Sequence, residues 1–135
     1  GNSSGRIAWG WLADCFGYRT IPFSLVFLSF SLMILYGTRS QSGLFLVASL
    51  LAGFGFGANF VLYAVQTALR HGSRGLALLY PKIFLAYGVA GITGPAMGGY
   101  LRDITGTYSA GIGMAVALLL IAAGVTAATG PIRRA

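Results

Sequence analysis

Charged residues divide this chain into four long segments that carry no charge. The residues that bound these segments are Arg19 and Arg39, Arg39 and Arg70, Lys82 and Arg102, and Asp103 and Arg133. Each segment is long enough for a helix across a hydrocarbon core of about 30 Å, which takes about 20 residues. Apolar residues do not alternate with polar ones at every second position, as they do in membrane β-barrels. The pattern therefore predicts four transmembrane helices, over residues 21–37, 44–69, 79–101 and 110–129.

The composition favours a membrane protein over other classes. Apolar residues make up 56% of the 135 residues and charged residues only 8%, whereas a soluble domain carries about 25% charged residues. Disordered chains are likewise rich in charge and poor in apolar residues. The net charge is +7, but the basic residues are scattered and form no stripe that would follow a nucleic acid. We expect an all-α membrane protein whose partner is the lipid bilayer and not a nucleic acid.

The basic residues also predict an orientation. Six arginines would share one side of a four-span chain, namely Arg6, Arg19, Arg70, Arg74, Arg133 and Arg134. The side richer in Lys and Arg is normally cytoplasmic. Both chain ends should then face the cytoplasm, with residues 1–20 as a loop and residues 130–135 as a tail, in a plasma membrane or bacterial inner membrane. Because the chain opens with Gly1 inside what reads as a loop motif, we expect it to be part of a longer protein.

The opening segment holds a cluster of charges and glycines. Arg6 and Arg19 bracket Asp14, which can pair with either arginine or cap a neighbouring helix N-terminus. Gly10 would let another helix approach, and Gly17 would permit a tight turn. Such a cluster can hold two helix ends together in one state and release them in another. On charge alone, a solvated loop that only sets the topology is the favoured interpretation.

Two stretches resemble a known transporter family. The first resembles the cytoplasmic loop motif of the major facilitator superfamily at Gly5, Arg6, Gly10, Leu12, Ala13, Asp14, Gly17 and Arg19. The second, over residues 86–108, is similar to the eleventh helix and following loop of the oxalate/formate antiporter family, and more loosely of the monocarboxylate porters. Its matching residues are Ala86, Tyr87, Gly88, Val89, Ala90, Gly91, Gly94, Pro95, Gly98, Gly99, Asp103, Thr105, Gly106 and Tyr108.

The resemblance implies that the four spans are helices nine to twelve of a twelve-helix major facilitator fold. The preceding helices of the same transporter would be the partners of this chain. The implied activity is secondary active transport of a small organic anion by alternating access. In this family an oxalate exchanger would be expected to carry a basic residue where this chain has Tyr87. We therefore expect a monocarboxylate such as formate, lactate or pyruvate ahead of oxalate.

Polar residues within the spans are candidates for a substrate cavity. Asn59, Tyr63 and Gln66 are spaced i, i+4 and i+7 and share one helix face, and Tyr87 lies in the third span. Polar groups at membrane depth are costly unless they meet a partner or a water-filled path. They could line a cavity, or they could hold helices together by hydrogen bonds, an interpretation favoured for Gln66. The span over 21–37 has only serines as polar side chains before Tyr36, the span over 110–129 has almost none, and both are interpreted as lipid-facing.

Small residues recur at helix-packing spacing. Gly53 with Gly57 and Gly94 with Gly98 each form a G-x-x-x-G pattern, which lets helix backbones touch. Pro95 lacks a backbone donor and should kink the third span. These positions could serve close packing alone, or they could be bending points for alternating access. Lys82 could pair with a carboxylate substrate, although an end-of-span lysine commonly extends to the headgroups.

The residues needed for catalysis are missing from the sequence. It has no Glu, one Cys and one His, His71, and nothing in it resembles a metal cluster, a catalytic triad or a carboxylate pair. We expect neither an enzyme nor a cofactor. A second interpretation is a self-standing four-helix membrane protein, either a homo-oligomeric exporter or a structural subunit. Small multidrug exporters depend on a carboxylate in the first span, whereas Asp14 and Asp103 both fall in predicted loops.

Overall fold

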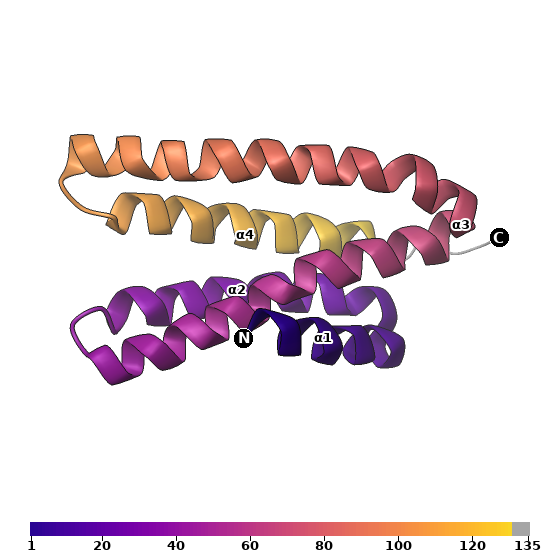
Figure 1. The fold of residues 1–135 in the computed structure, drawn as a ribbon, viewed down its shortest axis with the longest axis horizontal. Coiled ribbons are helices and arrows are strands. Elements are labelled where there is room, and N and C mark those ends of the chain that lie inside the picture. Colours follow the sequence, from indigo (N-terminus) through magenta and orange to yellow (C-terminus); the bar gives the residue numbers. More distant parts are fainter. Residues whose placement is uncertain (131–135) are drawn as a thin grey trace.

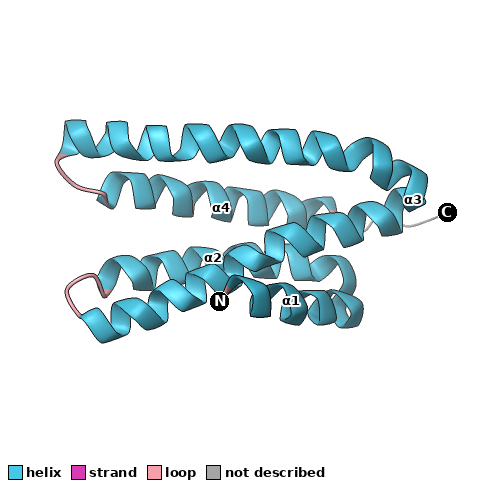
Figure 2. Cartoon of the chain, in the orientation of Figure 1, coloured by secondary structure: helices cyan, strands magenta, loops and turns pink. Residues whose placement is uncertain are grey.

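The computed structural model describes residues 1–130, and these residues form helices joined by short connections (Figure 2). The helices are α1 (Asn2–Phe16), α2 (Thr20–Gly37), α3 (Ser42–Thr105) and α4 (Ser109–Thr129), with a 3-10 turn (Gly17–Arg19) between the first two. The described residues contain no strand. The prediction of an all-α protein is confirmed, and the tail residues 131–135 lie outside the described part.

Helix α3 is not a single straight element. At 1.5 Å per residue its 64 residues would extend to about 96 Å. Inside it, Gly72 has φ 67° and ψ −175°, a backbone conformation open almost only to glycine. Figure 1 shows the ribbon of α3 reversing its direction near one end of the molecule. We call residues 42–71 the first arm of α3 and residues 73–105 the second arm.

The reversal gives the molecule two distinct ends. The bend end holds the α1–α2 turn, the reversal of α3 and the last turn of α4, and the loop end holds the α2–α3 and α3–α4 connections (Figure 1). The predicted spans over 44–69 and 79–101 fall within the two arms. The connection between them, expected as a basic loop, is helical on both sides of Gly72. A bend at Gly72 therefore connects the two arms where the sequence predicted a loop.

Three helical segments are long and apolar enough to cross a membrane. They are Asn2–Gly37, Ser42–Thr105 and Ser109–Thr129. A location in a membrane is consistent with these segments, because a span needs about 20 predominantly apolar residues.

The start of the chain is a helix where the sequence predicted a loop over residues 1–20. Gly5, Trp9 and Ala13 are spaced four residues apart and form the buried face of α1, against the first arm of α3. The glycine, tryptophan and alanine of the opening motif thus form a packing stripe. Only after Phe16 does the chain turn, through the 3-10 residues.

A tryptophan is the centre of the packed core. Trp9 is 1% exposed, and its ring centroid lies 5.6 Å from that of Phe27 and 6.0 Å from those of Phe23 and Phe54. Its indole Nε1–H donates a hydrogen bond of 3.1 Å to the Phe54 carbonyl oxygen. A buried indole needs such an acceptor. This cluster joins α1, α2 and the first arm of α3.

Glycines of the first arm let two helices approach it on different faces. A Cβ added to Gly57 would lie 2.6 Å from the carbonyl oxygen of Asn2 in α1, and one added to Gly55 would lie 3.0 Å from Phe27 Cδ1 in α2. Neither position has room for a side chain without a shift of its neighbours. In the second arm, a Cβ at Gly94 or Gly98 would meet no atom within 4 Å, so these glycines are open on that side.

Helix α2 has both a packed and an exposed side. It packs against the first arm and α4 and buries Ser24, Ser29 and Ser31, while Phe23 and Phe30 are exposed. Each serine hydroxyl donates to a carbonyl of its own helix, which satisfies it without a partner helix. Pro95 lies inside α3, whose sharp change of direction is at Gly72.

Replacing Gly72 by Ala should destabilise the protein by about 1–3 kcal/mol, because a Cβ is strained at this φ and ψ. Denaturant-induced unfolding in mixed micelles would measure this loss. Gly113→Ala in α4 is the control, since its new Cβ would meet no atom within 4 Å and alanine suits a helix better. Equal stability of both variants would contradict the role assigned to Gly72.

The two tryptophans of α1 provide a second test. Trp9→Ala should cost about 3–5 kcal/mol of unfolding free energy, since it opens a cavity in the aromatic cluster. Trp11, which is 66% exposed, is the matched control, and Trp11→Ala should cost far less in the same unfolding measurement. A loss of similar size for both variants would show that the Trp9 cluster is not the core.

Candidate functional site

Two aromatic stripes face each other across the arms of α3. Phe56, Phe60 and Tyr63 are spaced i, i+4 and i+7 on the first arm, and Tyr80, Phe84 and Tyr87 repeat this spacing on the second. Ring centroids of Phe60 and Tyr87 lie 5.1 Å apart, and those of Phe60 and Phe84 lie 6.4 Å apart. These separations are typical of favourable aromatic pairs. The stripes therefore fix the distance between the arms.

A pocket of about 180 Å³ lies between the stripes. We call it the aromatic pocket, and its lining residues are Asn59, Phe60, Tyr63, Tyr80, Ile83, Phe84 and Tyr87. Three of the four predicted cavity residues, Asn59, Tyr63 and Tyr87, thus meet in one place. An amide and three phenol groups can donate hydrogen bonds there, and no carboxylate is among the lining residues.

A larger hollow of about 500 Å³ adjoins the aromatic pocket toward the bend end, and the two share Tyr63 and Ile83. We call it the basic hollow, because Arg70, His71 and Lys82 all line it. Gln66, the fourth predicted cavity residue, belongs to this hollow and not to the aromatic pocket. The sequence indicated only a topology role for Arg70, and for Lys82 it left open a carboxylate substrate or the lipid headgroups.

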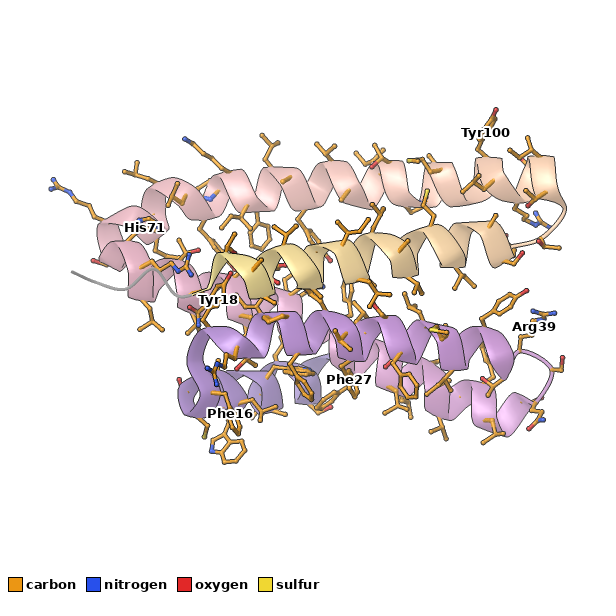
Figure 3. All side chains as sticks on the ribbon, turned by 180° about the vertical axis from the view of Figure 1, so that it is seen from behind. Phe16, Tyr18, Phe27, Arg39, His71 and Tyr100 are labelled. Carbon is orange, nitrogen blue, oxygen red and sulfur yellow. The ribbon has the colours of Figure 1, made fainter. Side chains whose placement is uncertain are left out.

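A polar clasp joins three parts of the chain at the bend end. The hydroxyls of Tyr18 and Thr129 lie 3.1 Å apart, and Arg70 Nη2 donates to the Gly130 carbonyl oxygen at 3.2 Å. The Arg70 guanidinium carbon also lies 4.6 Å above the Tyr18 ring, a cation–π distance. Figure 3 shows Tyr18 and His71 at this end and Arg39 and Tyr100 at the other. The clasp ties the α1–α2 turn to the bend and to α4.

The charged motif of the opening segment forms no latch between its own members in residues 1–130. Asp14 is exposed and pairs with neither arginine there. Arg6 instead donates from Nε to Asn2 Oδ1 at 3.2 Å and lies 4.4 Å above the Phe60 ring. Arg19 lines a separate apolar hollow of about 370 Å³ beside α1 and α2. Gly10 packs toward Val61 of the first arm, and Gly17 turns the chain with φ 59°.

The remaining candidates are surface groups. Cys15 is a free, exposed thiol, and His71 is exposed beside the bend. No group of three metal-ligating side chains occurs within the described residues. No protein-family model, curated protein or solved structure matches this chain. The aromatic pocket and the basic hollow are therefore the features that indicate a function.

Tyr18→Phe should lower the unfolding free energy by about 0.5–1.5 kcal/mol, the usual net contribution of one hydrogen bond. Thr129→Ala should cost a similar amount, and the double variant should cost less than the sum of the two. Unfolding of the four proteins of this cycle would measure the coupling. Tyr36→Phe is the control, because Tyr36 also lies under an arginine, Arg39, at 4.4 Å. Strictly additive losses at Tyr18 and Thr129 would contradict the clasp.

Proposed function

We propose that this chain is the four-helix C-terminal part of a major facilitator transporter that moves a small organic anion by alternating access. Helix α2, the two arms of α3 and α4 would be helices nine to twelve, and the preceding helices would complete the cavity. The bend end, with Arg70 and Arg74, would face the cytoplasm under the positive-inside rule. The location would be a plasma membrane or bacterial inner membrane.

The aromatic pocket is the observation that carries this proposal. Asn59 and Tyr63 come from one arm and Tyr87 from the other, yet all three line one space. Neighbouring groups on different helices can change their separation when helices tilt against each other, as alternating access requires. If these polar groups served only to hold the arms together, they would hydrogen-bond across the gap. Within residues 1–130, neither Asn59 nor Tyr87 has a hydrogen-bonding partner.

The chemistry of the pocket favours a monoanion. Its polar atoms belong to an amide and phenols, which can donate to a carboxylate without carrying charge themselves. The lining contains neither an acidic residue, which would repel an anion, nor a basic one, which a dianion would need. Apolar ring faces around these donors would suit the short carbon chain of lactate or pyruvate. Formate would fit the same donors, and oxalate is the less favoured substrate.

Asn59→Leu or Tyr87→Phe should lower uptake about 10- to 100-fold, because a hydrogen bond to a charged group contributes about 1.5–3 kcal/mol. Uptake of labelled formate, lactate and oxalate into proteoliposomes would measure this, with the transporter that carries this chain and its preceding helices. Tyr100→Phe is the matched control, since Tyr100 is 66% exposed and lies toward the loop end.

The same variants separate this proposal from a structural subunit. Membrane insertion and melting temperature should stay unchanged in Asn59→Leu and Tyr87→Phe while uptake falls. Unchanged uptake of all three anions in both variants would refute the assignment of the aromatic pocket. A loss of insertion without a specific loss of uptake would favour a role in holding the arms together.

A further inference from the structure

The basic hollow gathers basic side chains from two segments of the chain. Arg70, His71 and Lys82 line it from both arms of α3, and no acidic residue is among its lining residues. The whole sequence holds only two acidic residues, Asp14 and Asp103. Asp103 lies in the last turn of the second arm, and Asp14, in the last turn of α1, is not among the residues that line the hollow. Cations grouped in this way attract an anion from outside the protein.

A buried amide faces the same space. Gln66 is only 8% exposed, and its side chain has no hydrogen-bonding partner in residues 1–130. None of its polar atoms is sealed from the surface, and Gln66 lines the basic hollow. A polar group at such depth is costly unless it meets a partner. The hollow is where that partner would sit.

The clasp holds one cation ready for a ligand. Arg70 uses one N–H on the Gly130 carbonyl oxygen and stacks on the Tyr18 ring. A guanidinium has five N–H donors, so donors remain for an oxyanion. Lys82, from the second arm, forms no ion pair in the described residues. Arginine and lysine from two segments can therefore converge on one phosphate group.

The rest of the lining combines hydroxyl-bearing side chains with an apolar portion. Ile21, Leu79, Ile83 and Ala86 share the hollow with the basic residues. A ligand that fits this wall has an anionic head and a hydrocarbon tail. The hollow of about 500 Å³ is also much larger than the aromatic pocket of about 180 Å³, and it lies at the end of the helices, where headgroups would be. Basic pockets between helices at this depth are typical of acidic-lipid sites.

We propose that the basic hollow binds the phosphate headgroup of an acidic phospholipid through Arg70 and Lys82, with Gln66 as a further donor and an acyl chain along Ile21 and Ile83. The site adjoins the aromatic pocket, with which it shares Tyr63 and Ile83, but it does not depend on the proposed transport activity. A bound lipid here would neutralise the cations and brace the two arms against each other beside the clasp.

Binding of phosphatidylglycerol and of phosphatidylcholine to the purified full-length protein tests this site, with native mass spectrometry and melting temperature as readouts. Phosphatidylglycerol should bind more tightly and raise the melting temperature more. Arg70→Gln and Lys82→Gln should each weaken its binding about fivefold, the usual effect of one basic residue. Arg39→Gln is the matched control, since Arg39 also stacks on a tyrosine and lines a hollow, but at the loop end.

Each result decides the matter. A selective loss in the Arg70 and Lys82 variants supports the site, whereas an equal loss in Arg39→Gln overturns it in favour of diffuse surface charge. Should Arg70→Gln fail to fold, Lys82→Gln and Gln66→Leu carry the test, because neither residue has a hydrogen bond or ion pair to lose. If sn-glycerol 3-phosphate or formate raised the melting temperature and phosphatidylglycerol did not, the lipid proposal would be overturned. The hollow would then be assigned to a soluble anion.

Discussion

The reversal of α3 at Gly72 determines which parts of this molecule can meet. With φ 67° and ψ −175° at one residue, a helix of 64 residues becomes two arms that run side by side. The aromatic stripes then face each other, and the basic residues on either side of the bend reach one hollow. Without the reversal, Asn59 and Tyr87 would lie 28 residues apart along one helix, about 42 Å from each other.

Packing around the two arms is unequal. The first arm is held by α1 and α2 through the Trp9 cluster and through glycines that leave no room for a side chain. The second arm carries Leu85 and Ile92 on its surface, 71% and 76% exposed, and α4 buries only Ala123. Exposed apolar surface of this extent needs lipid or other helices to cover it. The first arm is therefore held by more packing within the chain than the second arm.

The two hollows differ in chemistry although they share Tyr63 and Ile83. Neutral donors and ring faces surround the aromatic pocket, while arginine, histidine and lysine side chains reach the basic hollow. A neutral donor set suits a single negative charge without holding it too tightly for release. A cluster of full charges beside apolar residues suits an anchored amphiphile. The clasp of Tyr18, Arg70 and Thr129 lies beside the basic hollow, at the bend end.

Local chemistry was sufficient to predict most of the helical segments. Apolar stretches long enough to cross a bilayer predicted helix over the larger part of α2, of both arms and of α4, because lipid requires the backbone of such a stretch to bond within itself. The pattern of charges did not reveal α1, since its stripe of Gly5, Trp9 and Ala13 becomes apparent only when the first arm lies against it. The spacing of Phe56, Phe60 and Tyr63, and of Tyr80, Phe84 and Tyr87, was present in the sequence and could have indicated the facing stripes.

The sequence by itself determined that the chain is all-helical, rich in apolar spans and suited to a membrane. It also placed Asn59 and Tyr63 on one helix face, because helical periodicity is a local property. Only the tertiary structure decided that Tyr87 joins them while Gln66 lies with Arg70 and Lys82. It also separated Asp14 from the arginines of its motif. The physical reason is that contacts between segments depend on the direction in which each helix leaves a turn, and one glycine conformation at residue 72 sets that direction for half of the chain.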